Sequence, residues 1–369
     1  MSASQRRPIP RLSLREIKLT NHSSALRLDV ASGERLVFFG DAPAELSRLC
    51  DVIAGFVAPA SGEILLDGRD ITSLSPVQRP IGLLSDRDPL FEHLTVRGNI
   101  AFPLQARKET AANLAARTNR VLALLGLDAA AEKRVAELTP EQAFRTRLGR
   151  LIAYAPSVIL LDDPLIGLDA AATRRSDALL ATLARALELT IIYATPRRDE
   201  ALRVGSRIAV FSGAELLQCA DAMTLLDRPE DERVAVLFGE ANALPGRVLK
   251  LDDDVARIRL AAGGVVEAMA DPELKEDTLC DVCIRPDRIA PLFGMSLAGE
   301  EDDPPLMATL QDLTHLGDHV RMRLRLEDGT EIELRRPPMQ NLRGVVPGVK
   351  VQLAWQAGQA VAFPLRDAL

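Results

Sequence analysis

Several residue types are scarce in this chain of 369 residues, and each shortage excludes a class of protein. Its four cysteines are too few for the disulfide framework that holds small secreted domains together. Its 45 lysines and arginines stand against 52 aspartates and glutamates, so the net charge is −7 and the basic excess of a general nucleic-acid binder is absent. We therefore expect no nucleic-acid partner.

Long apolar runs and lysines are also few. No apolar run approaches the ~20 residues that a membrane-spanning helix needs, and residues 1–11 are polar and arginine-rich, unlike a signal peptide. We therefore expect a chain that stays in the cytosol. Lysine does not occur between Lys18 and Lys108, so no phosphate-binding lysine can come from that stretch.

The first part of the chain alternates apolar strands with helical patterns. Residues 35–39 are typical of a short buried strand, and apolar residues then follow with helical spacing over residues 46–53. Apolar strands recur at residues 157–161 and 189–193, and residues 110–127 have a helical period. This alternation predicts an α/β fold with a mostly parallel sheet that is covered on both faces.

Later in the chain the pattern changes to short alternating strands. Residues 320–326 alternate apolar and basic side chains, residues 327–330 are typical of a hairpin turn, and residues 331–334 alternate back. We therefore predict two domains: residues 1–239 form the α/β domain, and residues 240–369 form an all-β domain of one or two small barrels.

Short motifs between residues 36 and 104 occur in an order and at spacings that are specific together. They are Ile53-Ala54-Gly55, Ser61-Gly62-Glu63-Ile64, Asp67-Gly68-Arg69-Asp70, Arg79-Pro80-Ile81-Gly82 and the run from Leu90 to Phe102. Ile284-Arg285-Pro286-Asp287 adds a further match in the second domain. With these motifs the chain resembles, over nearly its whole length, the ATP-binding subunits of ABC importers of the maltose, glycerol-phosphate and polyamine type.

The resemblance implies a fold, cofactors and partners. The fold is a P-loop NTPase-like ABC ATPase domain with a helical subdomain, followed by an oligonucleotide-fold-like regulatory domain of the TOBE/MOP type. The cofactors are ATP and Mg²⁺, and the partners are ABC permease subunits. The protein would be peripheral at the cytoplasmic face of the inner membrane, and the cargo would be a small solute such as a sugar or polyol that other subunits choose.

The phosphate-binding loop departs most from the family pattern. The family has G-x-x-x-x-G-K-[ST], whereas this chain has Gly40-Asp41-Ala42-Pro43-Ala44-Glu45-Leu46-Ser47. Such a loop directs backbone N–H groups and a lysine at the phosphates. Pro43 has no N–H, and Leu46 stands at the lysine position. Gly40 remains as a nucleotide contact and Ser47 as a ligand of Mg²⁺, although a serine early in a helix is also common without such a role.

The signature motif, which closes on the nucleotide of the opposite subunit, is altered too. The family has L-S-G-G-Q, whereas this chain has Leu138-Thr139-Pro140-Glu141-Gln142. By resemblance, Thr139 and Gln142 keep a hydroxyl and an amide for the nucleotide. A proline and a carboxylate replace the two glycines, and Glu141 would bring a negative charge towards the γ-phosphate.

Four further residues stand at positions where the family contacts the nucleotide, and some keep the family's residue type while others do not. Asp86 stands in place of the glutamine that senses the γ-phosphate, and Pro196 in place of the switch histidine. Asp162 matches the family residue that holds Mg²⁺. Asp163 matches the catalytic glutamate that polarises the attacking water, but its side chain is one methylene shorter. Both acids can instead persist as strand-end and turn residues, and the missing lysine favours that interpretation.

These observations predict a catalytically degenerate subunit of an ABC importer, with ATP binding weak or absent. It would form a heterodimer with an intact ATPase paralogue on the permease subunits. Selective loss supports this hypothesis, because the packing motifs keep the family pattern while the groups that contact ATP do not. Two alternatives stay open: a divergent but active ATPase that energises solute uptake, and a stand-alone sensor of a small ligand that uses the β domain.

Overall fold

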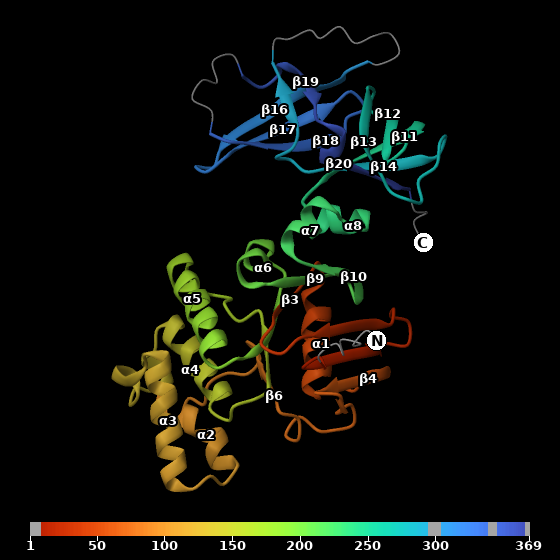
Figure 1. Cartoon of the computed structure of the whole chain (residues 1–369). Helices are drawn as coiled ribbons and strands as arrows, with labels where there is room; N and C mark the ends of the chain where they lie inside the picture. The colour runs from red at the N-terminus through yellow and green to blue at the C-terminus, as the bar shows by residue number, and fades with distance from the viewer. Residues whose placement is uncertain (1–8, 294–303, 339–344, 366–369) are drawn as a thin grey trace, which may run out of the picture. The chain divides into compact units, whose positions relative to one another are not determined.

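The computed structural model describes residues 9–293, 304–338 and 345–365 (Figure 1). The chain divides into two compact units, Met1–Ala222 and Met223–Leu369. Each unit has a hydrophobic core of its own. None of the described helices is long and apolar enough to cross a membrane.

A six-stranded sheet forms the centre of the first unit. Its strand order is β10-β9-β3-β8-β7-β6, in which β10 is antiparallel and the other pairs are parallel. The strands are β3 (Arg35–Gly40), β6 (Ile81–Leu84), β7 (Val158–Asp162), β8 (Thr190–Thr195), β9 (Arg207–Ser212) and β10 (Glu215–Ala220). Every residue of β7 and β8 is buried, as expected of parallel strands with both faces covered. The predicted mostly parallel sheet is confirmed.

A second, antiparallel sheet of four strands shares the same core. Its order is β2-β1-β4-β5, and buried residues alternate with exposed ones along β2 because one side of the sheet faces the core. The strands are β1 (Leu12–Lys18), β2 (Leu26–Val30), β4 (Ser61–Leu66) and β5 (Arg69–Asp70).

Helix α1 (Pro43–Ala54) buries Leu46, Leu49, Val52 and Ile53, which is the face that the sequence predicts. Three helices, α2 (Val96–Ala106), α3 (Ala111–Leu125) and α4 (Pro140–Ile152), pack on one another as a helical group (Figure 1). The packing is close, because a Cβ at Gly149 would lie 2.8 Å from the Leu125 side chain. Helices α5 (Ala170–Ala186) and α6 (Arg198–Val204) and the short turns η1 (Asp128–Ala130) and η2 (Val135–Glu137) complete the unit.

The second unit contains a closed barrel of order β11-β12-β13-β20-β14 and a five-stranded sheet of order β15-β19-β16-β17-β18. The barrel strands are β11 (Asn242–Asp252), β12 (Val255–Leu260), β13 (Val265–Ala270), β14 (Leu279–Ile284) and β20 (Ala360–Pro364). The sheet strands are β15 (Ala290–Leu292), β16 (Leu306–His315), β17 (Val320–Leu326), β18 (Glu331–Arg336) and β19 (Lys350–Ala354), and η3 (Ala357–Gln359) precedes β20. The β17–β18 pair is the predicted hairpin.

Helices α7 (Ala222–Asp227) and α8 (Glu232–Leu237) precede the barrel. The compact units divide after Ala222, so α8 groups with the barrel, against which its Ala235 packs beside Cys283 and Phe363. The domain junction that we predict after residue 239 falls between α8 and β11.

Candidate nucleotide site

The segment that holds phosphate in the family begins a helix in this chain. Only Asp41 and Ala42 lie between the end of β3 and Pro43, the first residue of α1. The N–H groups of Glu45 and Leu46 donate to the Ala42 carbonyl at 3.0 and 3.2 Å, and Pro43 has no N–H to offer. These groups close the first helical turn, so they are not directed at a bound phosphate.

The other residues of this segment have structural roles. A Cβ at Gly40 would lie 2.7 Å from the Phe211 carbonyl oxygen, so the approach of β9 itself requires a glycine there. The Asp41 carboxylate accepts hydrogen bonds from the Gly213 N–H at 2.9 Å and the Ser212 hydroxyl at 3.2 Å. The Leu46 side chain, at the lysine position, is 2% exposed and belongs to the core.

Ser47 and Asp162 lie together, as their proposed role at one metal ion requires. The Ser47 hydroxyl donates to Asp162 Oδ1 at 2.9 Å. Burial raises the pKa of Asp162, while the Ser47 hydrogen bond and the Arg87 charge oppose that shift. The Arg87 guanidinium lies 3.4 Å from Asp162 Oδ2 and also makes two bonds with Asp51, at 2.9 and 3.0 Å.

This donor set does not fit Mg²⁺ with a nucleotide. The hydroxyl and the carboxylate are ligands that Mg²⁺ accepts, but a guanidinium beside the same carboxylate opposes a divalent cation. The helix at Pro43 also leaves no loop to carry the phosphates that usually complete the coordination of the ion. Within the described parts of the chain, no group of three or more His, Cys, Asp or Glu side chains is arranged to hold a metal ion.

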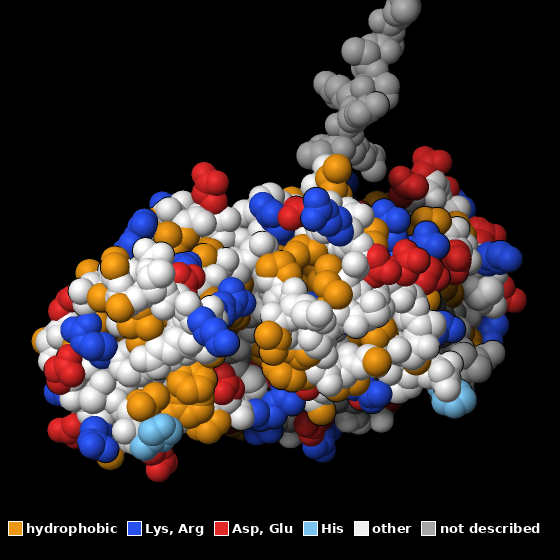
Figure 2. Space-filling view, turned by 90° about the horizontal axis from the view of Figure 1, so that it is seen from below, with side chains coloured by type: hydrophobic (Ala, Val, Ile, Leu, Met, Phe, Trp, Pro, Cys, Tyr) orange, Lys and Arg blue, Asp and Glu red, His pale blue; other side chains and the backbone are white. Residues whose placement is uncertain are grey.

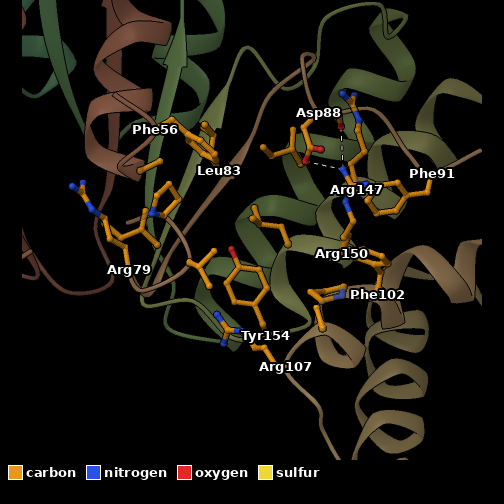
Figure 3. Close-up of a pocket in the computed structure, with 18 residues that line it drawn as sticks. Phe56, Arg79, Leu83, Asp88, Phe91, Phe102, Arg107, Arg147, Arg150 and Tyr154 are labelled. Atoms are coloured by element: carbon orange, nitrogen blue, oxygen red, sulfur yellow. Dashed lines mark hydrogen bonds and ion pairs between the residues drawn. The ribbon is translucent and has the colours of Figure 1, made fainter. Parts of the chain in front are cut away.

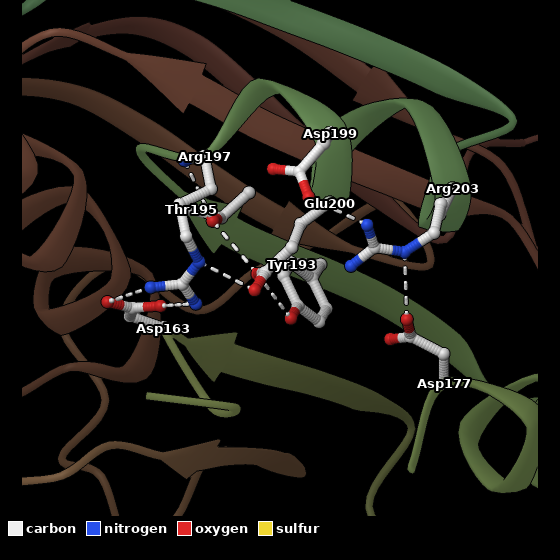
Figure 4. A network of polar contacts seen from close by, with 8 residues as sticks. All are labelled: Asp163, Asp177, Tyr193, Thr195, Arg197, Asp199, Glu200 and Arg203. Carbon is white, nitrogen blue, oxygen red and sulfur yellow. Dashed lines mark hydrogen bonds and ion pairs between the residues drawn. The ribbon is translucent and has the colours of Figure 1, made fainter. Parts of the chain in front are cut away.

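Asp163 is held by Arg197 (Figure 4). Its backbone has a φ of +43°, and its Oδ1 accepts a hydrogen bond from Arg197 Nη2 at 2.5 Å. Burial raises the pKa of Asp163, an effect that the Arg197 charge opposes. A carboxylate that polarises water must reach that water with a free oxygen. The ion pair with Arg197 occupies the carboxylate that our sequence analysis assigns to this role.

Arg197 is itself anchored by a buried carboxylate (Figure 4). Its Nε donates to Glu200 Oε1 at 2.6 Å, and Glu200 is 4% exposed. The other oxygen of Glu200 accepts hydrogen bonds from the Tyr193 hydroxyl at 2.9 Å and the Thr195 hydroxyl at 3.1 Å. We call Asp163, Tyr193, Thr195, Arg197 and Glu200 the Arg197 network. Each charged group in it has a partner, which removes the need for a bound cation.

The space that remains beside these residues is small. A cavity of about 160 Å³ is lined by Pro43, Leu46, Ser47, Asp86, Asp162, Asp163, Ala194, Thr195 and Pro196. Sites for small molecules usually have ~300 to 1,000 Å³. The structure therefore gathers Ser47, Asp86, Asp162 and Asp163 in one place, but around a volume below that of a typical ligand site.

The signature residues cap α4. The Thr139 hydroxyl accepts from the Gln142 N–H at 3.2 Å, and Gln142 Oε1 accepts from the Thr139 N–H at 3.1 Å. This reciprocal pair is a capping box. Both predicted nucleotide contacts are thus occupied in holding the start of their own helix.

Glu141 is compensated by two arginines. Arg145 Nη2 lies 2.5 Å from Glu141 Oε1, and Arg175 Nη2 lies 2.5 Å from Glu141 Oε2. The hydrogen bond from Arg175 is the main cause that lowers the pKa of Glu141. The glutamate that we expected to bring a negative charge towards a γ-phosphate is therefore part of an ion cluster on α4 and α5.

Sequence reasoning did not find Arg87, Arg197 and Glu200, although they set the electrostatics of this site. Asp86 and Arg87 follow β6, and Arg197 and Glu200 follow β8, so strands distant in sequence bring these groups together. The available signal was the position of these charged residues within five residues of the ends of parallel strands, whose carboxyl ends meet at one edge of a sheet.

Two family models match the chain: an ABC transporter model over residues 24–166 and a TOBE domain model over residues 282–363. A spermidine/putrescine import ATP-binding protein of Rubrobacter xylanophilus is 30% identical over 336 residues, which are 90% of this chain and 87% of that protein. A protein of the same description from Pseudomonas aeruginosa is 31% identical over 84% of this chain and 83% of its own length. A sulfate/thiosulfate import ATP-binding protein of Thermosynechococcus vestitus is 30% identical over 83% of each chain.

A solved structure shares the fold of part of this chain. CbiO1 of Clostridium perfringens, described as part of the ABC transporter complex cbiONQ, matches with a TM-score of 0.54 and 22% identity. The match covers 57% of this chain and 88% of that one, and at this identity it shows the fold alone. The two domain models, in the order that importer subunits have, and the relatives that match along most of their length agree. The chain belongs to the ABC transporter family, as an ATP-binding subunit of the importer type with a C-terminal TOBE domain.

Proposed function

We propose that this chain is a catalytically degenerate ATP-binding-type subunit of an ABC importer, paired with an intact ATPase paralogue. The observation that carries the proposal is the helix that begins at Pro43. It turns the phosphate-binding segment into a helical turn and places Leu46, at the lysine position, in the core.

Electrostatics support the same conclusion. A nucleotide triphosphate is held by charge-assisted bonds from backbone N–H groups and a lysine, and these bonds offset the cost of removing water from the phosphates. Here Asp86, Asp162 and Asp163 line the cavity, and the cations nearby already serve carboxylates of the protein. Loss of one well-placed donor typically lowers a rate by about 10²- to 10³-fold, and this chain has lost several.

Pairing with an intact paralogue follows from how the family builds its sites. Each ATP lies between the phosphate loop of one subunit and the signature of the other, so a homodimer of this chain would have both halves of both sites altered. A heterodimer would keep one site in which an intact loop faces Thr139 and Gln142. We propose that this pair is attached to permease subunits at the cytoplasmic face of the inner membrane.

The proposed cargo is a small solute of the sugar or polyol kind. The relatives are named as import proteins for other solutes, spermidine/putrescine and sulfate/thiosulfate. In such importers other subunits choose the solute, so uptake by the assembled complex, tested with polyamines and oxyanions beside sugars and polyols, identifies the cargo.

The test of this function is the composition and labelling of the native complex. The full-length chain is purified from membranes through an affinity tag, and its partners are identified by mass spectrometry. We expect permease subunits and a second ATP-binding subunit that has a complete phosphate loop. Photolabelling of the complex with azido-ATP should label that second subunit and not this chain. A complex without permeases, or specific labelling of this chain, would contradict the proposal.

One observation favours the alternative of a divergent but active ATPase. The Ser47 hydroxyl and Asp162 carboxylate lie 2.9 Å apart, and they are the two residue types that the family uses at its metal ion. In that alternative a nucleotide would have to displace Arg87 from Asp162 and Arg197 from Asp163. Phosphate release by the purified chain alone would then be measurable, and Ser47→Ala would abolish it.

A further inference from the structure

Two hollows away from the nucleotide site have the volume of sites for small molecules, which is about 300 to 1,000 Å³. One, of about 440 Å³, lies in the first unit and is lined by apolar side chains, four arginines and one carboxylate (Figure 3). The face of the molecule in Figure 2 likewise shows apolar side chains with lysine or arginine side chains between them. Such a surface suits a protein partner and belongs with the proposed assembly on permease subunits. The other hollow lies in the second unit, and the proposed function does not use it.

The hollow in the second unit has about 310 Å³ and lies between the barrel and the five-stranded sheet. Residues of β12 and β13 line it from the barrel, and residues of β16 and β19 line it from the sheet. Hydrogen bonds join the two sides. The Val265 N–H donates to the Pro304 carbonyl at 2.9 Å. Trp355 Nε1 donates to the Glu267 carbonyl at 3.0 Å. The hollow is therefore formed without a ligand, as most ligand sites are. We call it the Trp355 pocket.

Trp355 supplies an aromatic surface to this pocket. It is the single tryptophan of the chain, is half-buried, and follows the last residue of β19. Its hydrogen bond to the Glu267 carbonyl holds the indole in place and satisfies the one donor of that ring. The rest of the ring is apolar. Together with Leu306 and Leu353, which also line the pocket, it favours a ligand that has C–H groups on one face.

Two polar side chains that line the pocket are open to a ligand. In the described ranges of the chain, neither the Glu267 carboxylate nor the Gln352 side-chain amide makes a hydrogen bond or an ion pair. A carboxylate accepts hydrogen bonds, and an amide both donates and accepts them. Hydroxyl groups can therefore bond to both side chains without any charge on the ligand.

The charge of the pocket separates the classes of ligand. Arg257 is the one cation and Glu267 the one anion among the described residues that line it, and they are opposite each other in the β12–β13 register. An oxyanion is best held by an excess of cations and N–H donors, which this lining does not offer. A polyamine is best held by an excess of carboxylates, and Arg257 would repel it. A neutral ligand with several hydroxyls requires neither excess.

We propose that the Trp355 pocket binds a neutral sugar or polyol. The C–H groups of the ligand pack on Trp355, and its hydroxyls donate to Glu267 and exchange hydrogen bonds with Gln352. The inference goes beyond the proposed function and does not rest on it. The pocket lies within the second unit, and its ligand is bound by this chain itself, whichever solute the permease transports.

The single tryptophan makes the first test direct, because its fluorescence reports from the pocket alone. The purified full-length chain is titrated with glucose, maltose, glycerol and mannitol, and in parallel with spermidine and sodium sulfate. We expect a saturable change of the Trp355 emission with at least one neutral probe, with a dissociation constant of about 1 mM or tighter. Spermidine and sulfate should give none. Saturation by spermidine or sulfate, or no saturation by any neutral probe, overturns the proposal.

Variants then test the position of the site. Glu267→Gln and Gln352→Ala should each weaken binding about tenfold, because each removes hydrogen bonds to the ligand. The matched controls, Glu273→Gln and Gln311→Ala, change exposed side chains outside the pocket and should bind as the unmodified chain does. Thermal unfolding checks that each variant folds. If the pocket variants bind as tightly as the controls, the ligand is held elsewhere and the proposal is wrong. Neither failure touches the proposed function, because no permease or nucleotide enters these measurements.

Discussion

The guanidinium of Arg197 lies 2.5 Å from the carboxylate of Asp163, the residue that follows the last residue of β7. In an ABC ATPase the carboxylate at this position acts on the water that attacks ATP. In this chain a cation of the protein occupies it, and Glu200 fixes that cation from the other side. Both carboxylate oxygens of Asp163 thus accept from Arg197, Oδ1 at 2.5 Å and Oδ2 at 3.4 Å.

We predict that the chain alone binds Mg²⁺-ATP with a dissociation constant of about 1 mM or weaker. The loss of the lysine and of the N–H cradle removes most of the bonds that offset phosphate desolvation. Isothermal titration calorimetry measures the affinity, with the intact paralogue of the complex as the positive control. Micromolar binding by this chain would show that another set of residues replaces the loop.

Leu46→Lys alone should not restore hydrolysis. The lysine would start from a position 2% exposed in the core, and Pro43 and Pro196 would still oppose a nucleotide. Partial burial of an ammonium group should lower the free energy of unfolding by about 1 to 3 kcal/mol. Ala44→Lys, at an exposed position of the same turn, is the control and should be nearly neutral. Phosphate release and chemical unfolding are measured on both variants, and steady turnover in Leu46→Lys would refute our account of the segment.

Arg197→Ala should destabilise the first unit by about 2 kcal/mol, because it leaves Asp163 and the buried Glu200 without their counter-charge. Adding Asp163→Ala to that variant should recover part of the loss, since the second change removes one unpaired carboxylate. Arg174→Ala, in an exposed arginine of α5, serves as the control. Urea unfolding measures the free energy of unfolding of all three variants. Equal stability of Arg197→Ala and Arg174→Ala would mean that the Arg197 network contributes nothing.

The sequence predicts the buried face of α1 and the β17–β18 hairpin. Both follow from the regular spacing of apolar residues within one short segment of the chain. The turn of helix at Pro43 also had a signal, since proline is favoured at the first helical position and alanine and leucine are good helix formers. The spacing of Thr139 and Gln142 fits a capping box equally well. At Pro43 and at Thr139 and Gln142, our interpretation followed the family's nucleotide motifs and not these local signals for the start of a helix.

Ion pairs across the fold had no such signal. Glu141 and Arg145 are four residues apart on one helix, so their pairing could be predicted. Arg175 reaches Glu141 from α5, and Arg197 reaches Asp163 from the start of α6, 34 residues away in each case. No periodic pattern connects residues at that separation. Only the packing of strands and helices brings them together, so sequence reasoning left both acids as isolated charges.

Asp281→Asn should stabilise the second unit at pH 7 by about 1 kcal/mol, because it removes a carboxylate whose charged form burial disfavours. Asp281 lies in β14, is 9% exposed, and has no hydrogen-bond or ion-pair partner among the described residues. Burial raises its pKa in the folded state, so the folded chain binds this proton more tightly than the unfolded chain does. Its contribution to stability is therefore present below the unfolded pKa and is lost as the pH rises through the folded pKa.

The gain from Asp281→Asn should accordingly shrink as the pH falls and disappear below the ordinary aspartate pKa of about 3.9, where the aspartate becomes protonated in both states. Thermal unfolding at a series of pH values measures it. Asp254→Asn, in an exposed turn of the same unit, removes a charge of the same sign and is the control. A gain that did not depend on pH would contradict the assignment to burial of the charge.

The altered signature motif of this chain should limit the ATPase rate of its complex with an intact paralogue. Changing Pro140 and Glu141 together to glycine should raise its ATPase rate several-fold, because glycines let the backbone approach the γ-phosphate held by the intact loop. Glu141→Gln alone should have little effect, since Arg145 and Arg175 already offset the charge of Glu141. Ser47→Ala should leave the rate nearly unchanged, because Ser47 belongs to the site without a phosphate loop. ATPase assays of the reconstituted complex compare the three variants. If Ser47→Ala abolishes hydrolysis, the site of this chain turns over ATP, and the alternative of a divergent active ATPase is the correct one.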